Sequence, residues 1–300
     1  MPFKTLPTEG NFLALENKYS SFEDSAIAIL SAPYEKTVSY GGGTVNGPKA
    51  ILDASAYVEF YDDEFKSELC FKHGIATIEP LKFGKKEGKQ ALDLIEKSVA
   101  ELLDAGKFVV TLGGEHTIST APILAYFNKY PEMSVLHFDA HSDLRESYQG
   151  SQYSHASFMA RVTEKMNPEA ITQVGIRALC KEEAEFIKKN GVNTFFASSI
   201  RRGIHKKNWQ KQVVKTLNDL VYVTFDVDFF DPSIMPSTGT PEPDGFLYHE
   251  TLEVFRQLRL QGKKIVGFDI VELAPTPGIT HPDILTARLL YKMLNFAFTE

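Results

Sequence analysis

A hydrophobic run that ends in alternating acids and a histidine is the most chemically suggestive stretch of this chain. The run 135–138 has the β-branched and aromatic character of a buried strand, and Asp139, His141 and Asp143 follow it at alternate positions. In extended backbone, alternate side chains point to the same side, so two carboxylates and an imidazole would converge. Such a group needs a cation to neutralise it, so the stretch predicts a metal site. Aspartates that cap a following helix and a histidine that packs in the core would give the same pattern.

Two other predicted strands also end in residues that can bind metal ions. The predicted strand 108–112 leads to His116, and the predicted strand 221–228 ends in Asp226 and Asp228, which repeat the alternate spacing. Ligands of open parallel α/β sheets bind beyond the carboxyl ends of the strands, so we expect these groups to meet there. Four carboxylates and two imidazoles exceed what one ion with open positions needs. They suit two ions that share bridging carboxylates.

The composition of this predicted ligand set indicates the metal and its use. The set is rich in oxygen, contains some nitrogen and has no thiolate. It favours Mn²⁺, while Zn²⁺, Fe²⁺ and Co²⁺ also fit the ligand types, and we expect two Mn²⁺ ions per subunit. A pair of such ions lowers the pKa of water and stabilises an oxyanion as it develops, which predicts a hydrolase.

Strands and helices are predicted to alternate along the whole chain, without a linker, a repeat or a low-complexity segment. Strands are predicted at 25–34, 76–78, 108–112, 135–138, 171–177, 193–197, 221–228 and 265–271. Helices are predicted at 49–61, 87–105, 119–130, 155–166, 181–190, 208–217, 249–260 and 283–296. We therefore expect a single α/β domain over residues 1–300, a three-layer α/β/α sandwich around a mainly parallel sheet.

Composition narrows the class of partner. A formal charge of −7 argues against nucleic acid and suits a small cationic substrate. The glycine-rich stretch 41–47 lacks the spacing of a phosphate loop. Cys70 and Cys180 are too few for a disulfide framework. Residues 1–12 lack the pattern of a signal peptide, and no apolar run reaches membrane-spanning length, so we expect a cytoplasmic protein without a membrane partner.

Several segments together resemble the ureohydrolase family, which comprises arginases, agmatinases and formiminoglutamases. The segments are GGEH at 113–116, HFDAHSD at 137–143, DVDFFDP at 226–232, TGTPEP at 238–243 and GFDIVELAP at 267–275. They occur in the order of the family, and with the turn at 47–48 the resemblance covers nearly the whole chain. One departure is Glu115, where many members have aspartate; beside the ligand His116 it is expected to alter contacts behind the metal site.

The resemblance implies an arginase-like α/β/α domain, two Mn²⁺ ions and release of urea from a guanidine. The metal ligands that it implies are His116, Asp139, His141, Asp143, Asp226 and Asp228. It also implies that Glu272 binds the guanidinium, that His155 passes a proton to the departing amine, and that Asp228 stabilises the tetrahedral intermediate. Without the family, His155 is a histidine at a helix start and Glu272 an exposed carboxylate at a strand end. Assembly as a trimer or hexamer is a further implication of the resemblance.

Departures from the arginase pattern bear on the substrate. Arginases bind the α-carboxylate and α-amino groups through polar residues after the third ligand and an aspartate after a Gly-Leu-Arg strand end. Here Asp143 is followed by Leu-Arg-Glu, and Arg177 is followed by Ala178, which argues against arginine. The TGTPEP segment and the Ser-His-Ala around His155 resemble agmatinases, so we expect agmatine and water to yield putrescine and urea.

Other substrates and a different class of function stay open from the sequence. Arg145 suits a carboxylated substrate such as 4-guanidinobutyrate, although it could instead pair with Glu146 or with a neighbouring subunit. N1-aminopropylagmatine, arginine and formiminoglutamate are further alternatives. A non-catalytic regulatory homologue is the alternative to an enzyme, and loss of a ligand or of Glu272 would favour it; neither is lost here.

Overall fold

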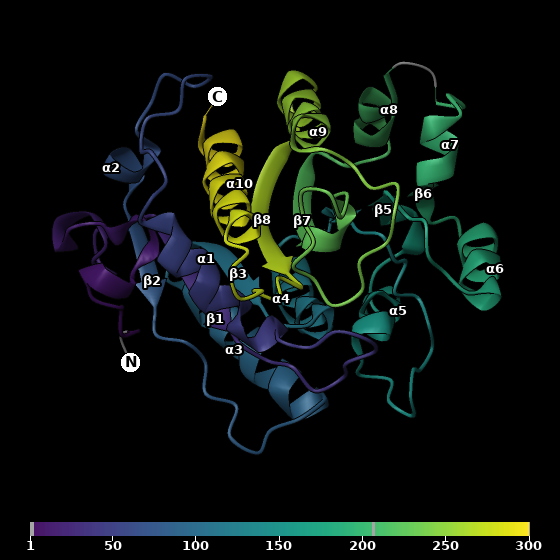
Figure 1. The fold of residues 1–300 in the computed structure, drawn as a ribbon, viewed down its shortest axis with the longest axis horizontal. Helices are drawn as coiled ribbons and strands as arrows, with labels where there is room; N and C mark the ends of the chain where they lie inside the picture. The colour runs from purple at the N-terminus through teal and green to yellow at the C-terminus, as the bar shows by residue number, and fades with distance from the viewer. Residues whose placement is uncertain (1–2, 206–207, 300) are drawn as a thin grey trace.

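Residues 3–205 and 208–299 are described by the computed structural model, and they contain one open sheet of eight strands (Figure 1). The strands are β1 (Ile27–Ala32), β2 (Ile75–Ile78), β3 (Phe108–Gly113), β4 (Ser134–Phe138), β5 (Ile171–Val174), β6 (Asn193–Phe195), β7 (Leu220–Asp226) and β8 (Lys264–Val271). Their order across the sheet is β2-β1-β3-β8-β7-β4-β5-β6, and every neighbouring pair is parallel. The predicted α/β class with a mainly parallel sheet is confirmed.

The order of the strands reverses in the middle of the sheet. After β3 the chain enters β4 three places further along, and β7 and β8 later fill the two places between them. Strands β1 and β4 are buried along their whole length, as strands covered on both faces must be. The carboxyl ends of β3, β8, β7 and β4 are therefore neighbours, and such a reversal of strand order is where open α/β sheets bind ligands.

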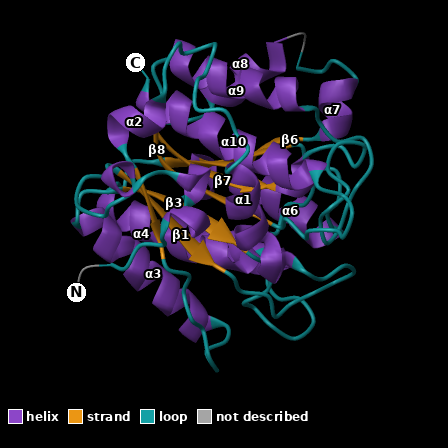
Figure 2. Cartoon of the chain, turned by 60° about the vertical axis from the view of Figure 1, so that its left-hand side comes forward, coloured by secondary structure: helices purple, strands orange, loops and turns teal. Residues whose placement is uncertain are grey.

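Helices cover both faces of the sheet and complete the predicted three layers (Figure 2). The layer packed in the larger apolar cluster contains α1 (Gly47–Ser55), α2 (Leu69–His73), α7 (Ala197–Arg201), α8 (Trp209–Lys215), α9 (Tyr248–Leu260) and α10 (His281–Phe298). The layer on the other apolar cluster contains α3 (Lys89–Asp104), α4 (Thr120–Lys129), α5 (Phe158–Thr163) and α6 (Lys181–Asn190). Aliphatic residues at helical spacing, such as Leu92, Ile95 and Val99 of α3, form the buried face of each long helix.

The structure departs from the prediction at short elements and at element ends; the predicted helix 49–61 ends at Ser55, and the predicted strand 171–177 ends at Val174. Helices α2 and α7 were not predicted, because five residues are too few to show a helical period. The predicted helix 155–166 begins with a 3₁₀ turn at His155–Ser157, and α5 follows it. The predicted strand 221–228 stops at Asp226, and Asp228 lies in a 3₁₀ turn. Within the described residues, no helix combines the length and the apolar character needed to cross a bilayer.

Candidate metal centre and active site

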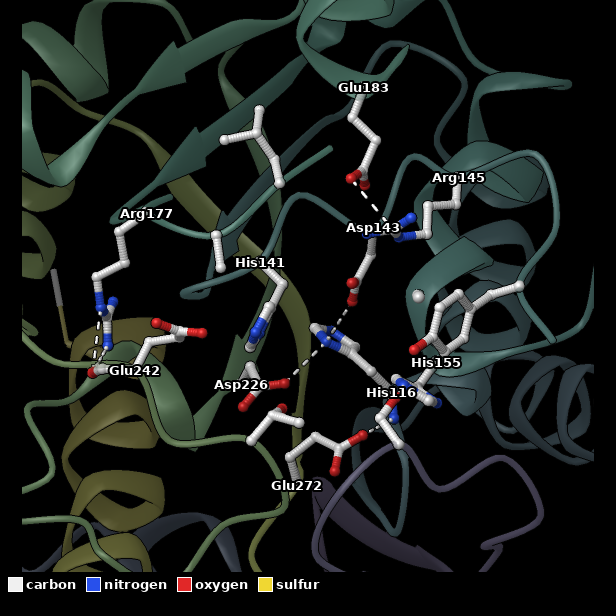
Figure 3. Close-up of a pocket in the computed structure, with 16 residues that line it drawn as sticks. His116, His141, Asp143, Arg145, His155, Arg177, Glu183, Asp226, Glu242 and Glu272 are labelled. Carbon is white, nitrogen blue, oxygen red and sulfur yellow. Dashed lines mark hydrogen bonds and ion pairs between the residues drawn. The ribbon is translucent and has the colours of Figure 1, made fainter. Parts of the chain in front are cut away.

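Four neighbouring strand ends meet at one cavity of about 540 Å³, and most of the predicted site residues line it, although Asp139 and Asp228 do not (Figure 3). Strand β3 leads to His116, β4 leads to Asp139, His141 and Asp143, β7 ends in Asp226 and leads to Asp228, and β8 leads to Glu272. The cavity lining includes His116, His141, Asp143, His155, Asp226 and Glu272. Residues more than 150 positions apart in the sequence thus share one site.

The His116 imidazole lies among three of the predicted carboxylate ligands. Its Nδ1 atom is 3.0 Å from Asp139 Oδ2, 3.1 Å from Asp226 Oδ2 and 3.4 Å from Asp143 Oδ2. The ring is buried and stacks on Phe158, with 3.9 Å between the ring centroids. The structure therefore gathers four of the six predicted ligands, from three strand ends, around one imidazole nitrogen.

Hydrogen bonds behind His116 decide which of its nitrogens faces this group. Thr224 Oγ1 lies 3.0 Å from His116 Nε2 and donates its own proton to Asp269 Oδ1 at 2.7 Å. The Thr224 oxygen therefore accepts from Nε2–H, which leaves a lone pair on Nδ1. Asp269 is fixed by Ser119 and Tyr222, whose hydroxyls donate to it at 2.8 Å each. The buried Nδ1 has no hydrogen-bond partner, so a lone pair and three carboxylates surround a place suited to a cation.

The second group of potential ligands shares Asp139 with the first. His141 Nδ1 lies 3.0 Å from Asp228 Oδ2 and 3.4 Å from Asp139 Oδ1. Asp228 Oδ1 accepts from the Ala140 N–H at 3.0 Å, and the Asp228 N–H donates to Asp226 Oδ1 at 2.8 Å. Asp139 belongs to both groups, as a carboxylate that bridges two ions would. The donor set therefore fits two divalent ions.

His137 lies beside these ligands and was not singled out from the sequence. Its Nδ1 accepts from Gln173 Nε2 at 3.0 Å, and the same Gln173 nitrogen donates to the Ser142 carbonyl at 2.7 Å. His137 therefore donates from Nε2 to Asp139 Oδ2, at 2.7 Å, and keeps no nitrogen for an ion. Burial lowers the pKa of His137, which keeps the ring neutral. The residue orients the Asp139 carboxylate; a histidine inside a buried strand was the available signal.

The buried acids and histidines perturb one another strongly. Burial and the charge of Asp139 raise the pKa of Asp143 to about 7. Burial and neighbouring carboxylates also raise the pKa of Asp226 well above its usual range. Burial lowers the pKa values of the His116 and His141 rings, but the surrounding carboxylates outweigh it and raise both well above the ordinary value. The site thus attracts positive charge, whether as protons or as metal ions.

Turns, and not the predicted extended backbone, make the β4 ligands converge. Strand β4 ends at Phe138, and Asp143 has a φ of 52°, in the left-handed region. Glu183 holds this turn, because its Oε1 accepts from Ser142 Oγ and from the Leu144 N–H at 2.9 Å each. The prediction that these side chains meet agrees with their positions, but the alternation proposed as its cause is wrong.

Glu272 lies just beyond β8, in the floor of the cavity. The alternative of an exposed strand-end carboxylate is wrong, because the residue is only partly exposed. Its φ is 65°, its N–H donates to the Gly114 carbonyl at 2.9 Å, and its Oε1 accepts from the His116 N–H at 2.7 Å. Burial raises the pKa of Glu272 to about 8. A carboxylate held this way beside the ligands can accept hydrogen bonds from a guanidinium.

His155 stands at the rim of the cavity between two hydroxyl groups. Thr37 Oγ1 lies 2.9 Å from His155 Nδ1, and Ser39 Oγ lies 2.7 Å from Nε2. Thr37 donates its own proton to Glu115 Oε1 at 2.9 Å, so it accepts from Nδ1–H and leaves Nε2 as the basic nitrogen. Burial lowers the pKa of His155 to about 4, so the ring is neutral near pH 7. The ring is poised to accept or pass a proton at Nε2.

Among the described residues, the Glu115 carboxylate hydrogen-bonds to the segment that holds His155 and not to a metal-ligand side chain, contrary to the expectation from its neighbour His116. Its Oε2 accepts from the Lys36 and Thr37 N–H groups at 2.5 and 2.6 Å. Its Oε1 accepts from the Thr117 hydroxyl at 2.6 Å as well as from Thr37. Burial raises the pKa of Glu115, and these four donors oppose that effect. The extra methylene of glutamate thus reaches the segment that holds His155.

Arg145 does not pair with Glu146, so that alternative is wrong. Its Nε lies 3.8 Å from Glu183 Oε2, and its guanidinium carbon lies 5.2 Å from the centre of the Tyr148 ring. Glu146 instead pairs with Arg161, with 3.0 Å between Nη2 and Oε1. Arg145 lines the cavity, but an acid and an aromatic ring already hold its charge.

The opposite wall contains Arg177 and Glu242, and Glu242 was not predicted as a site residue. Arg177 Nη2 donates to the carbonyls of Asp228 and Glu242 at 2.6 and 3.1 Å, and Nη1 donates to the Gly175 carbonyl at 3.2 Å. Its guanidinium is therefore engaged with main-chain carbonyls, and it ties the Glu242 loop to the Asp228 turn.

Comparisons with known proteins agree with this geometry. A model of the arginase family matches residues 25–295. The chain belongs to the arginase family. It is 38% identical to the N(1)-aminopropylagmatine ureohydrolase of Synechocystis sp. over 283 residues, which cover 92% of this chain and 90% of that protein. It is also 38% identical to the agmatinase of Bacillus anthracis, over 86% of each chain.

The fold is that of a solved relative as well. The crystal structure of the agmatine ureohydrolase of Thermoplasma volcanium superposes with a TM-score of 0.83 at 27% sequence identity. The match covers 99% of this chain and 95% of that one. The resemblance found from short segments of sequence therefore extends over the whole architecture, and the family is confirmed.

Proposed function

We propose that this chain hydrolyses the guanidino group of agmatine to release urea and putrescine, with two Mn²⁺ ions per subunit. The observation that carries the proposal is that two overlapping groups of His and Asp side chains share the buried Asp139, beside a cavity that His116, His141 and Glu272 line. We assign the ions to His116, Asp139, His141, Asp143, Asp226 and Asp228. When bound, such ions lower the pKa of water and stabilise developing negative charge.

The roles of the remaining groups follow from their positions. Glu272 accepts hydrogen bonds from the guanidinium N–H groups and holds the reacting carbon beside the ligands. Water adds to that carbon, and Asp228, whose carboxylate lies among the ligands, stabilises the tetrahedral intermediate. His155 accepts at Nε2 the proton that the added water gives up, and it passes this proton to the chain nitrogen as the bond between that nitrogen and the carbon breaks. The products are urea and a primary amine.

The names of the relatives support an amidinohydrolase and favour amine substrates. The similar proteins from Bacillus anthracis and Thermoplasma volcanium are named for agmatine. N1-aminopropylagmatine is the second candidate, because ureohydrolases of that substrate from Synechocystis and Thermus thermophilus are 38% and 35% identical to this chain. A cavity of about 540 Å³ has room for the longer amine. Arginine, 4-guanidinobutyrate and formiminoglutamate are less favoured, because the two arginines in the described lining of the cavity already contact Glu183 or main-chain carbonyls.

The sequence keeps a histidine or an aspartate at each proposed ligand position and a glutamate at 272, which supports an enzyme over a non-catalytic regulatory homologue. Homo-oligomeric assembly as a trimer or hexamer and a cytoplasmic setting remain part of the proposal. Sedimentation of the purified chain tests the first, and fractionation of its source cells tests the second.

Urea release tests the proposal directly. The chain is assayed with Mn²⁺ against agmatine, N1-aminopropylagmatine, arginine, 4-guanidinobutyrate and formiminoglutamate. We expect the highest kcat/KM with agmatine, loss of activity on chelation and its recovery with Mn²⁺. A preference for N1-aminopropylagmatine selects the second candidate. Absence of urea from every guanidine, with metal bound, refutes both.

A further inference from the structure

One carboxylate in the cavity wall has no partner in the described part of the chain. Glu242 lines the same cavity as His141 and Glu272, and Figure 3 shows its carboxylate turned toward His141. No hydrogen bond or ion pair from residues 3–205 and 208–299 reaches that carboxylate. An acid that faces a cavity of this kind is available to a cationic group of a ligand.

The other charged groups of the outer wall are already engaged. Glu183 accepts from Ser142, Leu144 and Cys180, at 2.7 to 2.9 Å. Arg145 forms an ion pair with Glu183 and lies over the Tyr148 ring. Arg177 donates to main-chain carbonyls (Figure 3). Arg177 is therefore committed to carbonyls and Arg145 shares its charge with Glu183 at 3.8 Å, whereas no described cation neutralises Glu242, which can attract an amine.

The position of Glu242 relative to the metal ligands is fixed by its main chain. Pro241 and Pro243 flank it, and proline restricts the backbone on both sides. Arg177 joins the Glu242 carbonyl to the Asp228 carbonyl through one guanidinium nitrogen, at 3.1 and 2.6 Å. The main chain of Glu242 is therefore fixed relative to the metal ligands. Its carboxylate can distinguish substrates by the distance between their guanidino and amino groups.

We propose that Glu242 binds the protonated amine at the far end of the substrate and so determines specificity, with Arg177 as its positioning residue. The proposal rests on the proposed function, because it places the guanidino group at the ligands and Glu272. Agmatine and N1-aminopropylagmatine both carry a protonated nitrogen four carbons from the guanidino group. A charge-assisted hydrogen bond to Glu242 selects both over substrates that carry a carboxylate near that position.

A substrate without the amine isolates this contact. Agmatine and 1-butylguanidine, which has the same chain without the amine, are compared in the Mn²⁺-loaded wild type and in Glu242→Gln. We expect Glu242→Gln to lower kcat/KM for agmatine about 10- to 100-fold, mainly through KM, and to change kcat/KM for 1-butylguanidine less than about twofold. Glu242→Asp, which keeps the charge on a shorter arm, is expected to fall between. Asp244→Asn is the matched control, because Asp244 lies on the same loop but pairs with Arg201 outside the cavity.

Two results overturn the proposal. Equal losses for agmatine and 1-butylguanidine in Glu242→Gln show a structural role, and an unchanged kcat/KM for agmatine shows that no contact exists. If the wild type releases no urea from any guanidine, the proposed function fails and calorimetry with putrescine still decides the role of Glu242. Binding by the wild type that Glu242→Gln weakens at least tenfold supports the amine site, and equal or absent binding rejects it.

Discussion

The floor of the cavity, at the candidate ligands and Glu272, differs from the outer wall, which includes Glu242, in how its polar side chains are held. In the floor, two of the candidate ligands have supporting side chains behind them: Thr224 and Asp269 behind His116, and His137 and Gln173 behind Asp139. In the wall, the Glu242 carboxylate has no such partner among the described residues.

This difference indicates that the floor supports the reaction and that the wall selects the substrate. Groups that must hold ions need fixed tautomers and orientations, and buried hydrogen bonds supply them. A group that selects the far end of a substrate needs an open hydrogen-bonding position, and the bound amine supplies the missing partner. Changes in the floor should therefore abolish turnover of all substrates, whereas changes in the wall should alter the choice among them.

The largest effect is expected from loss of a floor ligand. Asp228→Ala and His141→Ala should each lower kcat at least about 1000-fold with every guanidine, because removal of an ion forfeits several kcal/mol of transition-state stabilisation. Metal content measured after dialysis should fall below that of the wild type. Asp219→Ala is the control and should keep full activity, because Asp219 is exposed and lies just before β7, at the opposite end of the strand from the site. Full turnover in either ligand variant would contradict the assignment.

A smaller loss without loss of metal is expected at Glu272. Glu272→Gln removes the charge that faces the guanidinium but keeps a carbonyl oxygen for the His116 N–H. We expect kcat/KM to fall about 100-fold for all guanidines, since breaking a buried charge pair costs about 3 kcal/mol or more. Metal content should equal that of the wild type, which distinguishes this variant from Asp228→Ala. A fall confined to agmatine would instead place Glu272 with the wall.

The segments that carry the site could be predicted because hydrophobic runs end abruptly in ionisable residues. The runs before His116, Asp139 and Asp226 mark buried parallel strands, and their carboxyl ends must lie at one edge. That rule gives proximity without the order of the strands or the turns. The left-handed Asp143 and the 3₁₀ turn at Asp228 depend on contacts with distant segments, which a single sequence does not contain.

The supporting groups left weaker signals. His137, Thr224 and Asp269 each interrupt an apolar strand with a polar side chain, and a buried polar group needs a partner. This pattern indicates that a network exists, but it does not say which groups are joined. The contacts of Glu115 with Thr37 and of Arg177 with Glu242 cross 78 and 65 residues between loops, and no local spacing predicts them.

A moderate effect is expected at the hydrogen bonds that hold His155 at the rim of the cavity. Glu115→Gln can donate to Thr37 and so reverse the bond that fixes the His155 tautomer. We expect kcat to fall about tenfold with little change in KM, and the pH dependence of kcat to shift. Glu115→Asp, the residue of many family members, should retain more activity, and Thr37→Val should resemble Glu115→Gln. An unchanged pH profile in Glu115→Gln and Thr37→Val would show that this segment only supports the fold.

The smallest predicted effect is a shift in the unfolding temperature. It tests whether the negative charge of the floor binds the ions. Asp143 has a pKa of about 7 in the folded chain against 3.8 as its ordinary value, and the pKa of Asp226 is also raised. These two carboxyl groups bind protons in the metal-free fold that they have released in the unfolded chain, so their contribution to stability is complete below about pH 4 and is lost as pH rises through about 7. On the proposed function, Mn²⁺ replaces those protons. At a hundredfold excess over its Kd, Mn²⁺ should raise the unfolding temperature by about 5 °C or more at pH 8, and by less at pH 5.5. Calorimetry of the metal-free and loaded protein measures this, with Asp93→Asn as a surface control. An equal rise at both pH values would mean that the ions bind elsewhere, and the contrast between floor and wall would lose its basis.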